Sequence, residues 1–199
     1  TVLLGNNPSF YRYLREAPRG TTWDAAELAD AWEFRAYSTS PQDANWRLTA
    51  PPVRPVDAPA ISRSELEDDK FAYSLARHYI RDDPGMFVYS CVFRIGRLWQ
   101  LTPYRTTSSE STIRLLSRIL TGCWYSLLFL LAIVALVSMR AIAFRSPVVW
   151  GLLLCLAFTG MHAVYWSNMR MRAPLMPFVC LLAASGAARI ANRLDGRKP

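Results

Sequence analysis

Residues 119–139 read ILTGCWYSLLFLLAIVALVSM and contain no charged side chain, while Arg118 and Arg140 stand directly on either side. At about 1.5 Å of rise per residue, a helix of this length crosses the hydrocarbon core of a bilayer. This stretch therefore predicts a transmembrane helix, and it decides the class of fold.

Two further uncharged stretches follow, at 148–166 and 173–188. The first has Trp150 near one end and Tyr165 and Trp166 at the other, which is typical of the aromatic belts of membrane spans. The second is shorter, and we expect it to cross if Arg189 reaches back to the interface or if the helix tilts among neighbours. The chain is thus predicted to be mainly α, a polytopic membrane segment with about three transmembrane helices.

Charge divides the chain into two unlike parts. Residues 1–110 carry 13 Lys and Arg against 14 Asp and Glu, whereas residues 111–199 carry 10 Lys and Arg against the single acid Asp195. The basic residues of the second part bracket the apolar stretches, as in membrane proteins, and do not form a basic face on a soluble fold. We therefore predict a soluble or membrane-surface region at 1–110, a transmembrane region at 111–199, and no nucleic-acid partner.

The first region is predicted to be mostly helical. Residues 1–5 (TVLLG) are expected to form a short buried strand, and a chain that opens on such a strand is predicted to be part of something longer. Ser62 and Glu65 fit a capping box that opens a helix to about Arg81. Asp83 and Pro84 fit the N-cap and first position of another helix that runs to Trp99.

The helix predicted at 84–99 has a broad apolar face that includes Val88, Val92 and Ile95, with Arg94 and Arg97 expected to leave the opposite side. A basic amphipathic helix that ends in Trp suits a membrane surface. A helix in the core of the soluble region fits the same pattern, and the sequence leaves both possibilities open.

The loop charges predict the orientation. Six basic residues flank the apolar stretches on the side of the C-terminal tail and four on the other side, so the tail is expected in the cytoplasm and residues 1–110 outside. Arg170 and Arg172 then lie at the outer face. Pro174 disfavours helix at Ala173, and in extended chain the two guanidinium groups would share a face and bind one phosphate. Ordinary anchoring of both arginines among lipid headgroups is the alternative.

His162 and Tyr165 precede this turn and are further candidates for the same site, although the favoured explanations are a hydrogen-bonded structural histidine and a belt aromatic. Nothing in the spacing of histidines, acids and the four cysteines suggests a metal site or a disulfide framework. No cofactor is predicted.

The stretch from His162 to Pro177, HAVYWSNMRMRAPLMP, resembles the C-terminal region of bacterial membrane glycosyltransferases of the GT-C class, relatives of protein O-mannosyltransferases and lipid A aminoarabinose transferases. Within it, residues 170–177 (RMRAPLMP) resemble the Arg-x-Arg-x-Pro-x-x-Pro segment of many such proteins. Residues 79–87 and 97–99 resemble the segment that these proteins place before a late span. The resemblance covers roughly residues 65–190.

This resemblance implies transfer of a sugar from a polyprenyl-phosphate donor at the outer face of the bacterial cytoplasmic membrane. It implies donor-phosphate binding by Arg170 and Arg172, with His162 and Tyr165 lining the site. The catalytic aspartate of the family lies in an early extracytoplasmic loop, so no residue of this chain is assigned as the base. The alternative is a non-catalytic membrane protein whose outer helical domain binds a lipid or a protein.

Overall fold

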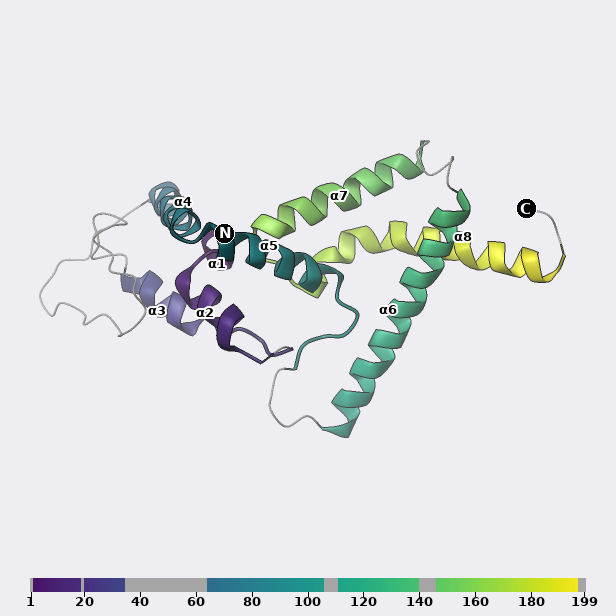
Figure 1. Cartoon of the computed structure of the whole chain (residues 1–199), viewed down its shortest axis with the longest axis horizontal. Helices are drawn as coiled ribbons and strands as arrows, with labels where there is room; N and C mark the ends of the chain where they lie inside the picture. Colours follow the sequence, from purple (N-terminus) through teal and green to yellow (C-terminus); the bar gives the residue numbers. More distant parts are fainter. Residues whose placement is uncertain (1, 19, 35–63, 106–110, 140–145, 197–199) are drawn as a thin grey trace, which may run out of the picture. The chain divides into compact units, whose positions relative to one another are not determined.

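The computed structural model describes residues 2–18, 20–34, 64–105, 111–139 and 146–196. Within these ranges the chain is mainly α-helical and contains no β-strand (Figure 1). The chain divides into two compact units. Unit 1 comprises residues 1–94 and 163–167, and unit 2 comprises residues 95–162 and 168–199.

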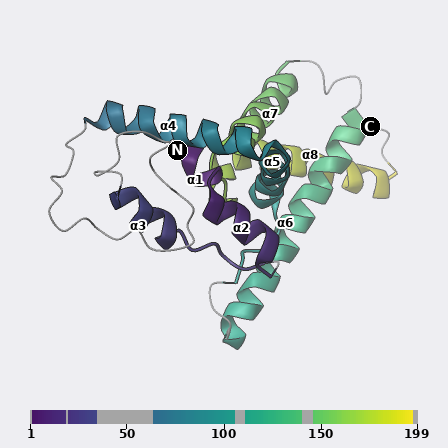
Figure 2. The same ribbon diagram turned by 60° about the vertical axis from the view of Figure 1, so that its left-hand side comes forward.

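Unit 1 is built from short helices around one apolar core. Its helices are α1 (Val2–Gly5), α2 (Pro8–Glu16), α3 (Ala26–Phe34), α4 (Glu65–Asp82) and the first part of α5 (Pro84–Trp99). Helix α1 lies beside α4 (Figure 2), and their apolar side chains form the core together with Leu28 of α3. The buried members of this core are Val2, Leu3, Leu28, Phe71, Ala72, Leu75 and Ala76.

The strand predicted at residues 1–5 is wrong, because Val2–Gly5 forms a helical turn. The buried side chain of Asn6 donates to the Val2 carbonyl at 2.8 Å, and that of Asn7 donates to the Leu3 carbonyl at 3.0 Å. These amides satisfy the carbonyls at the end of the turn, which a strand would have offered to a neighbouring strand. A short apolar run does not distinguish the two conformations by periodicity.

The helix starts of unit 1 follow side-chain capping. Asn7 accepts the Phe10 N–H at 2.9 Å to open α2. Ser64 and Glu67 form the capping box of α4, two residues later than the pair the sequence suggested. Asp83 accepts the Met86 N–H at 3.0 Å, which confirms the predicted start of α5 at Pro84.

Unit 2 holds the longest helices. It contains the end of α5, then α6 (Thr112–Met139), α7 (Val148–Val164), the 3₁₀ helix η2 (Met169–Leu175) and α8 (Met176–Leu194). Helices α6 and α8 cross and pack through small side chains (Figure 1). Ala132 and Ala135 of α6 meet Val179 and Leu182 of α8 in the core of this unit.

Two helical segments are long and apolar enough to cross a membrane, namely α6 with 28 residues and Met169–Leu194 with 26. The predicted spans 119–139 and 173–188 fall within them. Helix α7 has 17 residues and ends two residues before the predicted span does. Core helices of soluble proteins meet the same criteria of length and composition, but they are mostly buried, whereas the apolar windows of these two segments are only 17% and 28% buried.

Candidate functional site

The turn that carries the two arginines is helical. Asn168 caps η2 by accepting the Arg170 N–H at 2.9 Å, and Met169–Leu175 forms a 3₁₀ helix despite Pro174. With about three residues per turn, residues two apart point in different directions. The extended turn with a shared guanidinium face, predicted from Pro174, is therefore wrong.

Arg172 is the buried arginine of η2, with 1% of its surface exposed. Its Nη1 donates to the Leu98 carbonyl at 3.1 Å and to the Gln100 carbonyl at 2.7 Å. These carbonyls lie at the C-terminal end of α5, the negative end of the helix dipole. Arg172 therefore joins η2 to the end of α5 through a charge-assisted contact.

Aromatic rings of α6 cover the Arg172 guanidinium. Its Cζ atom lies 4.2 Å from the centroid of the Tyr125 ring and 5.3 Å from that of Phe129. Such cation–π contacts stabilise a guanidinium group that is shielded from water. The Nε and Nη2 atoms are buried and have no hydrogen-bond partner among the described residues. Both atoms are therefore enclosed by the protein and are not open to solvent.

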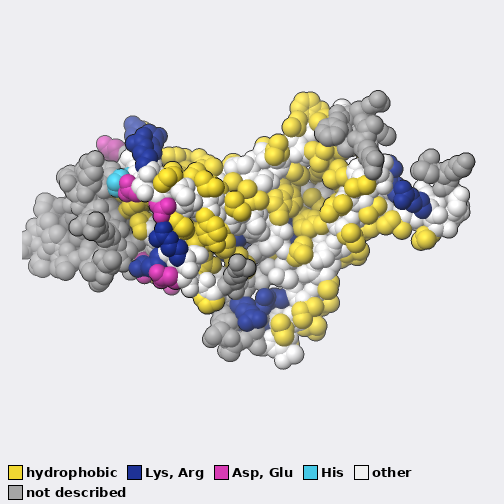
Figure 3. Space-filling view, in the orientation of Figure 1, with side chains coloured by type: hydrophobic (Ala, Val, Ile, Leu, Met, Phe, Trp, Pro, Cys, Tyr) yellow, Lys and Arg dark blue, Asp and Glu magenta, His cyan; other side chains and the backbone are white. Residues whose placement is uncertain are grey.

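Counter-charge is scarce around this arginine. Among the described residues of unit 2 the one acidic residue is Asp195, beyond the end of α8. The basic residues of these long helices are arginines near the start of α6 and near the end of α8 (Figure 3). A buried guanidinium without a carboxylate favours an anionic partner, because burial penalises an uncompensated charge.

Arg170 is exposed, in contrast to Arg172. Its backbone is fixed by the Asn168 cap, and its guanidinium forms no hydrogen bond or ion pair with the part of the chain that the structure describes. The two arginines therefore differ in role. Arg172 is held inside the fold, and Arg170 presents a free cation on the surface of the same turn.

The other two candidate residues have partners of their own. The ring of His162, near the end of α7, lies 5.6 Å from that of Phe158. The hydroxyl of Tyr165 shares a hydrogen bond of 2.9 Å with the hydroxyl of Tyr73. Tyr165 belongs to unit 1, and the other three candidates belong to unit 2.

Arg94 and Arg97 are the residues that sequence reasoning misplaced. Both were expected on the side of the helix opposite its apolar face. They are buried, at 0% and 7% exposure, whereas Val88 and Val92 of the apolar face are exposed. In unit 1, Arg94 donates from Nε to the Ala163 carbonyl at 2.7 Å and from Nη2 to the Asn6 amide oxygen at 3.2 Å. It also donates to the carbonyl of Gly5. Arg94 thus satisfies carbonyls near the ends of α1 and α7. The adjacent asparagines at 6 and 7 are a weak sequence signal of such a polar centre.

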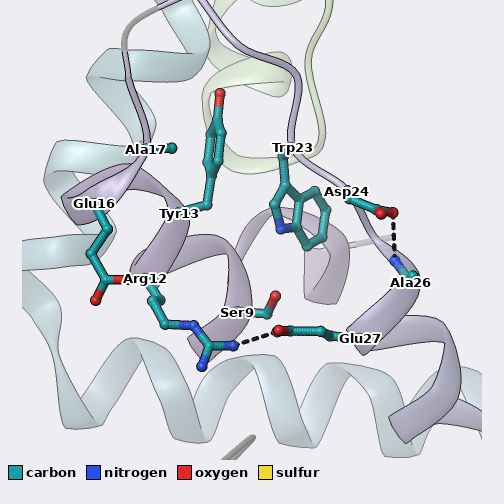
Figure 4. A pocket seen from close by; sticks show the side chains of 9 residues that line it. All are labelled: Ser9, Arg12, Tyr13, Glu16, Ala17, Trp23, Asp24, Ala26 and Glu27. Atoms are coloured by element: carbon teal, nitrogen blue, oxygen red, sulfur yellow. Dashed lines mark hydrogen bonds and ion pairs between the residues drawn. The ribbon is translucent and has the colours of Figure 1, made fainter. Parts of the chain in front are cut away.

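Unit 1 also has a shallow pocket between α2 and the start of α3 (Figure 4). Arg12 and Glu27 form an ion pair at its base. Asp24 accepts the Ala26 N–H at 3.0 Å and so caps α3. Tyr13 donates to the Thr21 carbonyl at 2.6 Å. Most polar groups of this pocket thus serve the local fold.

Metal and disulfide chemistry find no support in the described ranges. No group of three or more His, Cys, Asp or Glu side chains there is arranged to hold a metal ion. Cys91, Cys123, Cys155 and Cys180 are all free thiols. The chain matches no protein-family profile, no curated protein and no solved structure.

Proposed function

We propose that this chain belongs to an integral-membrane glycosyltransferase of the bacterial cytoplasmic membrane, which moves a sugar from a polyprenyl-phosphate donor to an acceptor at the outer face. One observation carries the proposal. The turn η2 presents the exposed guanidinium of Arg170, in a unit whose described residues include one acid, Asp195. This arrangement suits a phosphate.

In the proposed reaction, an acceptor hydroxyl oxygen attacks the anomeric carbon of the sugar, and the bond from that carbon to the phosphate oxygen breaks. A general base takes the hydroxyl proton, and the polyprenyl phosphate leaves with the bonding electrons. Arg170 would stabilise the negative charge that develops on the leaving phosphate, which is an electrostatic contribution to catalysis. No residue of this chain is assigned as the base.

The roles of the two arginines differ from those the resemblance implied. Arg170 is the proposed phosphate ligand, since its guanidinium is exposed and uncommitted. Arg172 is a positioning residue, since Nη1 holds the carbonyls of Leu98 and Gln100 and fixes η2. For His162 and Tyr165, the only remaining support for a role in phosphate binding is that they lie close to η2 in the sequence.

The test uses the whole protein in liposomes and measures binding of undecaprenyl phosphate together with thermal stability. We expect Arg170→Ala to weaken binding by about tenfold or more, the value of a lost charged hydrogen bond, and to leave the melting temperature unchanged. Arg172→Ala should lower both, because it removes a buried cation from its carbonyl partners. Arg193→Ala, at an exposed arginine in the last turn of α8, is the matched control.

Unchanged binding by a folded Arg170→Ala variant would exclude the phosphate site. That result would favour a second function, a non-catalytic membrane protein with an outer helical domain. The contacts of Arg172 with Leu98 and Gln100 favour it, because they explain the burial of that arginine without any ligand. It predicts that neither arginine variant changes undecaprenyl phosphate binding.

A further inference from the structure

Helix α5 exposes a continuous uncharged stripe. Val88, Val92 and Ile95 are 60%, 64% and 36% exposed, and Tyr89 is exposed beside them. Gly85 and Gly96 extend the same row at both ends. Their spacing of three and four residues places all six on one face of the helix. No charged side chain is exposed anywhere on α5.

The charges of α5 face inward. Arg94 is fully buried and donates to backbone carbonyls and to Asn6, and Arg97 is buried with its guanidinium 4.7 Å from the ring centroid of Tyr104. A helix on the surface of a water-soluble protein does the reverse and turns its arginines to solvent. Burial of both arginines together with exposure of the valines favours a surrounding medium that accepts aliphatic side chains.

The residues on either side of the stripe indicate which medium the stripe contacts. The preceding helix α4 carries exposed charged residues up to Arg81 and Asp82, and this charge stops at Pro84. At the other end, Ile95–Trp99 belongs to unit 2, the unit that contains the candidate spans α6 and α8. In the sequence, the apolar face of α5 is therefore followed by the most apolar part of the protein.

We propose that the α5 stripe, from Gly85 to Gly96, lies among the acyl chains of bilayer lipids, while Arg94 and Arg97 remain inside the protein. A helix of this length spans about 24 Å, less than the hydrocarbon core, so α5 enters the bilayer from one side or lies along its boundary. This contact differs from both possibilities that the sequence left open, a basic amphipathic helix on a membrane surface and a core helix of the soluble region, because the arginines face inward and the apolar stripe faces outward. It does not depend on sugar transfer.

The test is nitroxide labelling of the full chain in vesicles of phosphatidylcholine and phosphatidylglycerol. The four native cysteines are replaced by serine, and a single cysteine is placed at Val92 or, independently, at Val88. Collision rates are measured with oxygen, which concentrates in lipid, and with a water-soluble nickel complex. Arg77→Cys on α4 is the aqueous control, and Ile133→Cys on α6, at a side chain that is 56% exposed, is the lipid control.

We expect the ratio of oxygen to nickel collisions at residues 88 and 92 to equal that at residue 133 and to exceed that at residue 77 severalfold. A ratio equal to that at residue 77 overturns the proposal, because the stripe then faces water. Low collision rates with both reagents overturn it as well, because another protein segment then covers the stripe. If residue 133 itself gives the aqueous ratio, the membrane location fails together with the stripe. A thermal melt of each labelled variant confirms its fold.

Discussion

Gly186 offers the sharpest test of how unit 2 is packed. A Cβ atom at this position of α8 would lie 2.0 Å from the carbonyl oxygen of Leu131 and 3.3 Å from the backbone nitrogen of Ala135 on α6. Both are backbone atoms, which cannot rotate away as a side chain does. Gly186→Ala must therefore move the Cβ atom about 1.4 Å or more away from the Leu131 oxygen to reach an ordinary contact. Such close approach is the reason small residues occur at helix crossings in membranes.

A displacement of this size loosens the contacts of Ala132 and Ala135 with Val179 and Leu182, the core of the crossing. A gap of 0.5 to 1 Å loses about a quarter to a half of each dispersion contact. Overpacking of a well-filled core costs about 1–3 kcal/mol. For a chain of about 200 residues this lowers the melting temperature by about 2–12 °C. The assay is thermal unfolding of the full chain in detergent, followed by circular dichroism.

Gly160→Ala is the matched control. Gly160 lies in α7, and a Cβ there would meet no atom within 4 Å. Both substitutions gain the same helix propensity, about 1 kcal/mol, so the difference between the two variants isolates the packing cost. If Gly186→Ala melts at the same temperature as Gly160→Ala, the close approach of α6 and α8 is refuted.

Two further predictions concern unit 1. Burial raises the pKa of Tyr11 to about 12 from 10.0, so its neutral form stabilises the fold fully below pH 10, and this stability is lost as the pH rises to 12. Tyr11→Phe should flatten the decline in unfolding free energy over that interval by up to about 2.7 kcal/mol, measured by denaturant titration at each pH; equal slopes for wild type and Tyr11→Phe would contradict it. Ser64→Ala removes the cap of α4 and should cost about 0.5–2 kcal/mol of stability, whereas an unchanged midpoint would mean that the capping box contributes nothing.

Local signals predicted much of the helical framework. The uncharged run at 119–139 lies within α6, and the Asp83-Pro84 pair opens α5 as expected. Capping and long apolar runs involve neighbouring residues, so the sequence shows them directly. The short segments at 1–5 and 169–175 were predicted less well, because asparagine side chains at residues 6 and 168 decide their backbone conformation.

The candidate site shows the limit of local reasoning. The sequence indicated that Arg170 and Arg172 matter, but it treated them as equivalent. The structure separates them, because the carbonyls that Arg172 meets belong to Leu98 and Gln100, more than seventy residues away in the chain. Contacts at such separation leave no periodicity for a sequence pattern to reveal.

The sequence by itself determined that this protein is mainly helical and where its longest helix lies. It also determined that nearly all acidic residues lie in one half of the chain and the long apolar stretches in the other. These properties follow from composition and from hydrogen bonds between near neighbours. Only the tertiary structure decided which face of α5 is inside. Arg94, Arg97 and Arg172 are buried because distant backbone carbonyls and aromatic rings replace the water that each guanidinium loses, and those partners come together only when the helices pack.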